Sequence, residues 1–110
     1  MTVGIMGRMI SEINNRIKDV ERLCIHYRVQ RLDLFGSAVT TQYNAEESDL
    51  DFVVEFQPLP AGEYADTYFG LLESLEQLFN CPVDLIIGSA IKNPYFLKSV
   101  EKTRTPVYET

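Results

Sequence analysis

The sequence predicts an α/β or α+β fold in which helices pack on one small mixed β-sheet. Two observations carry this prediction. Apolar residues recur at helical spacing in two segments, and an Asn-Pro pair marks the start of a third helix. Three short segments rich in β-branched and aromatic residues are bounded by Gly, Pro or polar turns. Their order is helix, strand, strand, helix, strand, helix, with an edge strand at the end. At 110 residues, the chain is expected to form a single domain spanning residues 1–110.

The first half of the chain contains one helix and two strands. The apolar positions of the helix are three or four residues apart: Ile10, Ile13, Ile17, Val20, Cys24 and Tyr27. The segment RLDLFGS then predicts a short strand that stops at Gly36, with Leu32 and Leu34 on one face and Asp33 and Phe35 on the other. After a polar loop, DLDFVVEF predicts the second strand.

The second half alternates between helix and strand. A helix is expected from Glu63 to Asn80, and the segment VDLIIG predicts a third strand. A last helix is expected to start with Asn93 as its N-cap and Pro94 at its first position. The segment TPVYE predicts the edge strand.

Composition and charge limit the function. Apolar residues make up 45% of the chain and the net charge is −6, so a broad contact with a nucleic-acid backbone is not expected. No segment is long and apolar enough for a membrane span, and the N-terminal segment lacks the pattern of a secretory signal. Cys24 and Cys81 have no metal-ligand spacing and are expected to be reduced core thiols. These features predict a cytoplasmic protein. A divalent cation would still let an acidic protein bind a nucleotide.

Two carboxylates stand at the head of the second strand. Side chains alternate along a strand, so Asp49 and Asp51 are expected on one face, about 6 to 7 Å apart at their backbones, while Leu50 and Phe52 point into the core. Two carboxylates this close repel each other unless a proton, an arginine or a metal lies between them, and an all-oxygen pair favours Mg²⁺ or Mn²⁺. Asp49 could instead be an ordinary surface charge.

Two further features point to the same site. Asp84 is the one charged residue in VDLIIG, where an ionised group is costly unless it is paired, solvated or bound to metal. Gly36 and Ser37 follow a strand, where a glycine allows close approach of a phosphate and a serine hydroxyl can donate to it. Alternatives remain: Gly-Ser could be a plain turn, and Asp84 could pair with an arginine.

These residues together resemble a family signature. The run GSAVTTQYNAEESDLDFVV, from Gly36 to Val54, resembles the Gly-Ser and Asp-x-Asp motif of minimal nucleotidyltransferases, small relatives of the polymerase-beta-type superfamily. VDLI resembles the strand that carries their third carboxylate. The closing segment AIKNPYFLKSVEKTRTPVYE is similar to that of bacterial members that act as antitoxins. The resemblance runs from Ile10 onward and implies a polymerase-beta-like nucleotidyltransferase fold.

The resemblance also implies roles for individual residues. Gly36 and Ser37 would hold the triphosphate of the nucleotide, and Asp49 and Asp51 would ligate two Mg²⁺ ions. Asp84 would complete the metal cage and accept the proton of an attacking hydroxyl. In the family, antitoxin members transfer AMP from ATP to a tyrosine of a HEPN-type toxin, a helical ribonuclease. ATP as substrate and such a toxin as partner are therefore implied.

The chain departs from the family motif in two ways. The family reads GSxARG, whereas this chain has Thr40 at the arginine position and Thr41 at the second glycine. Eleven residues lie between Ser37 and Asp49, one more than in the motif, which leaves the alternation of the aspartates intact. A positive charge near the phosphates is missing. Three basic residues could replace it, although each is expected to be solvated: Lys92, Lys98 and Arg104.

Three functions are compatible with these patterns. The first is a Mg²⁺-dependent nucleotidyltransferase that adenylylates a tyrosine of a HEPN-type toxin. The second is an antitoxin of the same fold, weakly active or inactive, that neutralises its partner by binding alone. The first is favoured because a purely binding protein has no physical reason to retain mutually repelling aspartates. A nucleotidyltransferase for small molecules is disfavoured because the chain is too short for an acceptor domain, unless a homo-oligomer supplies one.

Overall fold

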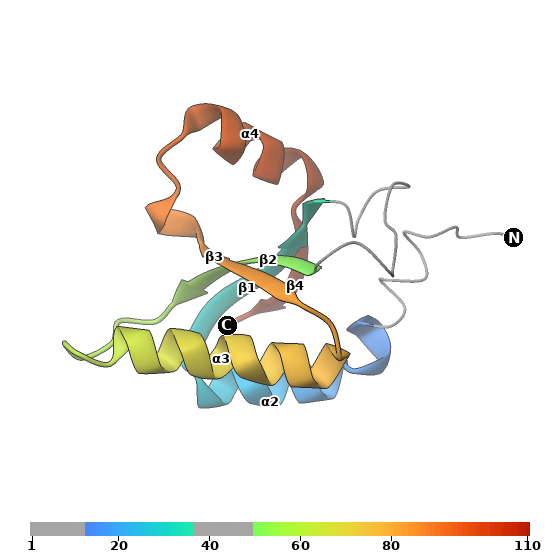
Figure 1. Cartoon of the computed structure of the whole chain (residues 1–110), viewed down its shortest axis with the longest axis vertical. Helices are drawn as coiled ribbons and strands as arrows, with labels where there is room; N and C mark the ends of the chain where they lie inside the picture. The colour runs from blue at the N-terminus through green and yellow to red at the C-terminus, as the bar shows by residue number, and fades with distance from the viewer. Residues whose placement is uncertain (1–12, 37–49) are drawn as a thin grey trace, which may run out of the picture.

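The computed structural model describes residues 13–36 and 50–110. A four-stranded sheet in the order β3-β2-β1-β4 carries helices on both faces (Figure 1). β1 runs antiparallel to β2 and to β4, whereas β2 and β3 are parallel. The sheet is therefore mixed, and the predicted fold class is confirmed.

The order of the elements also agrees with the prediction, including the terminal edge strand. After a helical turn at 13–15, the elements are α2 (Ile17–His26), β1 (Val29–Phe35), β2 (Leu50–Phe56), α3 (Tyr64–Phe79), β3 (Val83–Ile87), the short 3₁₀ helix η2 (Gly88–Ala90), α4 (Pro94–Thr103) and β4 (Thr105–Glu109). The expected helical residue Ile10 lies outside the described residues. Asn93 caps α4 as predicted, since its side-chain oxygen accepts hydrogen bonds from the backbone N–H groups of Tyr95 and Phe96.

The main hydrophobic core lies between the sheet and the helices α2 and α3, which run side by side below it in Figure 1. Alternate residues of the strands face this core, among them Leu32 and Leu34 of β1 and Leu50 and Phe52 of β2, all almost fully buried. Leu71 and Leu75 of α3 and Val20 and Cys24 of α2 complete it.

A second, smaller core lies on the opposite face, where α4 covers part of the sheet (Figure 1). It consists of Phe35, Val53 and Val100, with Ile86 and Ile91 packed against them. Residues 32–35 of β1 are therefore buried on both faces of the sheet. The candidate site lies on the face that carries α4.

Side chains of α3 cover part of the outer edge of β3. The carboxylate of Glu76 accepts a hydrogen bond from the backbone N–H of Val83, and the hydroxyl of Tyr68 donates to the carbonyl of Leu85. Backbone groups at a sheet edge would otherwise be open to another strand. These two bonds also fix β3, which carries Asp84, against α3.

Two observations bear on predictions made from composition. Both cysteines are free thiols, Cys24 buried and Cys81 half-buried, in agreement with the prediction. Within residues 13–36 and 50–110, no helix has the length and apolar character that crossing a bilayer requires.

Candidate functional site

Two of the three predicted carboxylates lie on neighbouring strands in register. Asp51 of β2 and Asp84 of β3 are partners across the parallel pair, so their side chains project from the same face of the sheet. Because Phe52 and Leu85, the next residues along, are buried in the main core, that face is the one carrying α4. Asp51 is half-buried and Asp84 is exposed. Asp49, the third predicted carboxylate, lies outside the described residues.

Gly36, at the end of β1, lies directly against Asp51. Its φ of +79° belongs to the left-handed region that favours glycine. A Cβ placed on Gly36 would lie 2.6 Å from Oδ2 of Asp51, far closer than such atoms approach. A side chain at this position would push the carboxylate aside. The Gly-Ser corner and the Asp-x-Asp strand therefore meet at Gly36 and Asp51, whereas Ser37 lies outside the described residues.

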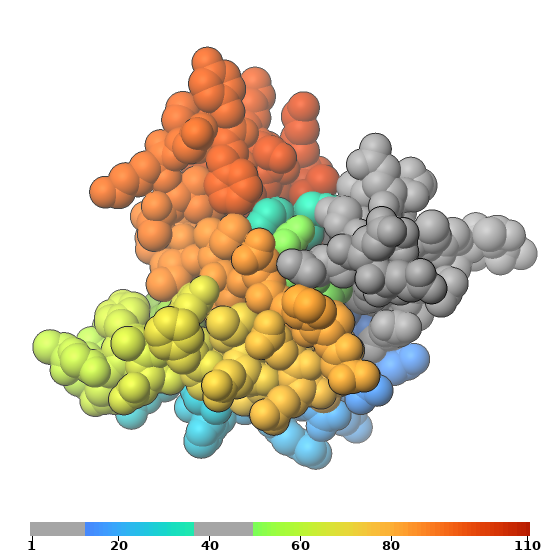
Figure 2. All heavy atoms as spheres, viewed as in Figure 1, coloured from blue at the N-terminus to red at the C-terminus, as the bar shows by residue number. Residues whose placement is uncertain are grey.

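The backbone N–H of Gly36 is already used within the protein. It donates a hydrogen bond of 2.9 Å to the hydroxyl of Thr103, the last residue of α4. This amide is therefore not open to a phosphate, and the contribution of Gly36 is the space that its missing side chain leaves beside Asp51. Figure 2 shows the ends of β1 and β2, in teal and green, reaching the surface beside the C-terminal end of α4.

A buried ion-pair network lies behind the site. Asp33 of β1 is fully buried and contacts two arginines, Arg104 after α4 and Arg31, whose Nε lies 2.9 Å from Oδ2 of Asp33. Arg104 also donates to Glu101 at 2.8 Å. Burial opposes the charge of Arg104, but its hydrogen bonds and attraction to Asp33 and Glu101 outweigh this, and the pKa of Arg104 lies above its ordinary value.

This network corrects one expectation. Arg104 was expected to be a solvated side chain that could replace the missing arginine of the motif. Its side chain is only 17% exposed and its guanidinium is held by Asp33. The prediction for Arg104 is wrong because β4 pairs with β1, and Arg104, the residue just before β4, therefore lies against the buried side chain of Asp33. The other two basic candidates, Lys92 and Lys98, are exposed as expected.

The carboxylate pair suits a hard cation. Asp84 forms no ion pair with any of the described residues. The alternative in which Asp84 pairs with an arginine is therefore not observed among these residues. Two carboxylates in register favour a cation between them, and oxygen ligands are those that Mg²⁺ prefers. The described residues contain no group of three or more potential metal ligands, and Asp49 is not among them. Burial, followed by the charge of Asp84, raises the pKa of the Tyr68 hydroxyl.

The contacts of two residues beside this site were not predicted from the sequence. Thr103 and Arg104 join the end of α4 to β1 through Gly36 and Asp33. Their partners are 67 and 71 residues away in the chain, so no local spacing indicates the contacts. The one available signal was Asp33 itself, a charged residue inside an apolar strand that needs a buried partner.

Comparisons with known proteins agree with this arrangement. A family model described as nucleotidyltransferase domain matches residues 13–107. The chain is 36% identical over 96 residues to a candidate protein adenylyltransferase of Methanocaldococcus jannaschii, covering 86% of this chain and 94% of that protein. A second protein of this organism with the same description is 34% identical over 96 residues, with the same coverage.

Solved structures give the same result. The structure of a candidate minimal nucleotidyltransferase matches with a TM-score of 0.67 at 28% identity, covering 84% of this chain and 90% of that one. A chain of a toxin–antitoxin complex with AMP-PNP matches with a TM-score of 0.64 at 18% identity, covering 86% and 73%. A complex of tri-AMPylated HEPN toxin of Shewanella oneidensis with its MNT antitoxin gives 0.61 at 17%, covering 89% and 73%. At these identities the last two show the fold alone.

Proposed function

The chain belongs to the nucleotidyltransferase domain family, as a minimal nucleotidyltransferase, and from this membership we propose that it transfers AMP from ATP to a hydroxyl group of a protein acceptor. The observation that carries the proposal is the position of Asp51 and Asp84, in register on neighbouring strands, with Gly36 against Asp51. This arrangement places two carboxylates, which can supply oxygen ligands, beside the space that the missing side chain of Gly36 leaves open.

Each residue has a distinct task in the proposed reaction. Asp51 and Asp84, together with Asp49, would hold two Mg²⁺ ions, for which Mn²⁺ could substitute, and the ions would neutralise the charge that develops on the phosphates. Gly36 leaves room for the triphosphate beside Asp51, and Ser37 would donate to its oxygens. Asp84 is exposed and can meet an incoming hydroxyl.

The bond changes follow from an in-line displacement. The oxygen of the acceptor hydroxyl forms a bond to the α-phosphorus, the bond from that phosphorus to the bridging oxygen of the β-phosphate breaks, and pyrophosphate leaves. The hydroxyl proton passes to the carboxylate of Asp84. The missing arginine at Thr40 is expected to slow this step rather than to prevent it, because the carboxylates remain.

We further propose that the acceptor is a tyrosine of a HEPN-type toxin and that the chain acts as its antitoxin. The support is the fold shared with an MNT antitoxin whose partner toxin is AMPylated, together with the similarity to candidate protein adenylyltransferases. A cytoplasmic location follows from such a partner.

The test combines transfer and binding. The purified chain is incubated with ATP, Mg²⁺ and a HEPN-type protein encoded beside it, and intact mass spectrometry measures the addition of adenylyl units. Asp51→Asn and Asp84→Asn are expected to abolish the addition, whereas Asp66→Asn, an exposed acid in the first turn of α3, serves as matched control. Circular dichroism verifies the fold of each variant. Transfer that survives in both site variants contradicts the assignment of the site.

The same experiment separates the alternative function. A stable complex with the partner and no added mass would indicate an antitoxin that acts by binding alone. The departure at Thr40 and Thr41 is what favours this second reading.

A further inference from the structure

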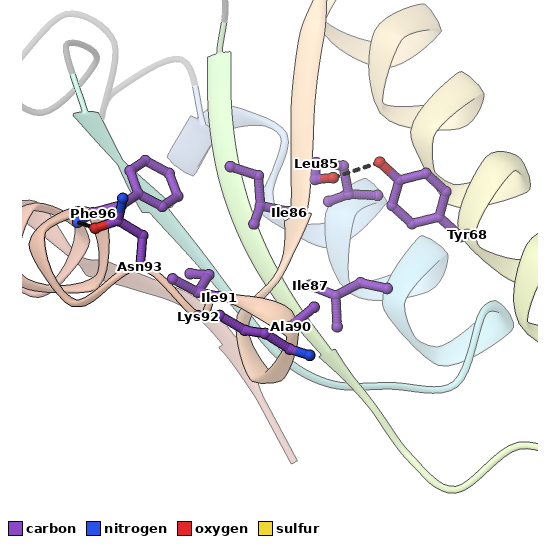
Figure 3. A pocket seen from close by; sticks show the side chains of 9 residues that line it. All are labelled: Tyr68, Leu85, Ile86, Ile87, Ala90, Ile91, Lys92, Asn93 and Phe96. Atoms are coloured by element: carbon purple, nitrogen blue, oxygen red, sulfur yellow. Dashed lines mark hydrogen bonds between the residues drawn. The ribbon is translucent and has the colours of Figure 1, made fainter.

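An open apolar pocket lies beside the carboxylates, between β3, η2 and α4. Its volume is about 430 Å³, within the range of ligand pockets. Figure 3 shows Ile86 reaching into it from β3, Phe96 from α4 and Ala90 and Ile91 from the intervening segment. Nothing in the proposed chemistry of the carboxylates uses this pocket.

The lining of the pocket suits an apolar ring. Three of its nine lining residues carry polar side chains: Tyr68, Lys92 and Asn93. The hydroxyl of Tyr68 donates to the carbonyl of Leu85, and the side-chain oxygen of Asn93 accepts from the backbone of α4 (Figure 3). A nucleobase has several donors and acceptors along its edge, and this mainly apolar lining offers few partners for them. A phenol ring has an apolar body and a single polar group at its tip.

The location of the pocket matches the acceptor side of the proposed reaction. In an in-line displacement, the entering and leaving oxygens lie on opposite sides of the α-phosphorus. Gly36, beside which pyrophosphate would leave, directly follows β1, and Asp84 is on β3, across the central strand β2. Ile86 follows Asp84 by two residues on the same face of β3, about 6 to 7 Å along the strand. A phenol ring held against Ile86 can therefore direct its hydroxyl towards Asp84.

We propose that this pocket seats the aromatic ring of the acceptor, a tyrosine side chain of a partner protein, with the hydroxyl directed at Asp84; the proposal rests on the proposed function. The outer surface of α4 supports a protein rather than a small molecule as its source. Tyr95 is 84% exposed and Leu97 is 39% exposed, and they flank Phe96, the residue of α4 that lines the pocket. A protein segment that places a tyrosine in the pocket would cover these side chains as well.

The first test measures which ring enters the pocket. The ¹⁵N-labelled chain is titrated with N-acetyl-tyrosinamide and, separately, with adenosine. Tyrosinamide is expected to shift the amide signals of Ile86, Ala90 and Phe96, and adenosine is expected to leave them unchanged. Shifts caused by adenosine alone would assign the pocket to the nucleobase and overturn the proposal. Absence of shifts with tyrosinamide would overturn it too.

The second test fills the pocket and measures transfer. Ala90→Phe places a ring in the pocket from an exposed position on η2, and Ser89→Phe adds the same ring at an exposed neighbour that does not line it. Ala90→Phe is expected to raise the KM for the HEPN-type acceptor about tenfold or more, with the Kd for Mg²⁺·ATP within about twofold of wild type. Ser89→Phe is expected to match wild type. Equal acceptor KM values for both variants would refute the proposal.

The two tests also distinguish the failure of this inference from that of the proposed function. If wild type neither binds Mg²⁺·ATP nor adenylylates the acceptor, the proposed function fails. If wild type transfers AMP and Ala90→Phe transfers it with an unchanged KM, only the role of the pocket is wrong.

Discussion

Replacing Arg104 by methionine is expected to lower the free energy of unfolding by about 2 to 3 kcal/mol. Removing one partner of a buried ion pair costs about 3 to 5 kcal/mol when the remaining charge is left alone. Asp33 is fully buried but retains Arg31 at 2.9 Å, so the loss should fall below that range. Oδ1 of Asp33 has no hydrogen-bond partner within the described part of the chain. Arg31 is therefore the main group left to compensate the charge of Asp33. A loss of this size lowers Tm by about 10 °C.

Urea denaturation followed by circular dichroism measures this loss. The double variant Asp33→Leu with Arg104→Met is expected to regain about 1 kcal/mol or more relative to Arg104→Met, because it removes the buried carboxylate that the single variant leaves with Arg31 as its remaining partner. Arg22→Met is the control: Arg22 pairs with Asp19 on the surface, so its loss should stay within about 0.5 kcal/mol. The reasoning is refuted if Arg104→Met costs no more than this control, or if the double variant is as unstable as the single one.

Three further predictions follow from the site and the core. Gly36→Ala and Gly62→Ala both place a side chain at positive φ, so each should lower the free energy of unfolding by about 1 kcal/mol. Only Gly36→Ala crowds Asp51, so only this variant should lose Mg²⁺·ATP binding in calorimetry. Binding retained by Gly36→Ala contradicts the site. Thr103→Val should raise the KM for ATP, whereas Thr103→Ser should keep the wild-type KM, because serine retains a hydroxyl that accepts the hydrogen bond from the backbone N–H of Gly36. Equal KM values for the two variants would show that this hydrogen bond is not needed. Burial, followed by the charge of Glu21, raises the pKa of Cys24 to about 12, so above the ordinary pKa of a thiol the unfolded state loses a proton that the folded state keeps. Stability should then fall as pH rises, by up to about 1.4 kcal/mol per unit, and urea titrations at pH 7 and pH 10 should show a smaller fall in Cys24→Ala; parallel falls would argue against this linkage.

The sequence predicts the elements because their signals are local. Helical spacing marks α2 and α3, and the Asn93-Pro94 pair marks the start of α4. The alternation of strand residues also predicts which neighbours of Asp51 are buried, and Leu50 and Phe52 are. The presence of Asp84 beside Asp51 follows from the order and register of the strands, which no local pattern in the sequence specifies.

Other features could not be predicted, because they depend on contacts between distant parts of the chain. Arg104 resembles a surface residue at the end of a helix, and only the return of β4 along β1 brings it to Asp33. The bond between Gly36 and Thr103 has the same origin. The roles predicted for Ser37 and Asp49 stay predictions, because these residues lie outside the described part of the chain.

The covered edge of β3 limits how this sheet can be extended by another molecule. Because Glu76 and Tyr68 occupy two outward-facing backbone groups of β3, an added strand would compete with bonds already made there. β4 has a neighbour on one side only. A self-association that continues the sheet should therefore use β4, two strands away from β2, and would leave Asp84 and the adjoining pocket accessible to a different protein at the same time.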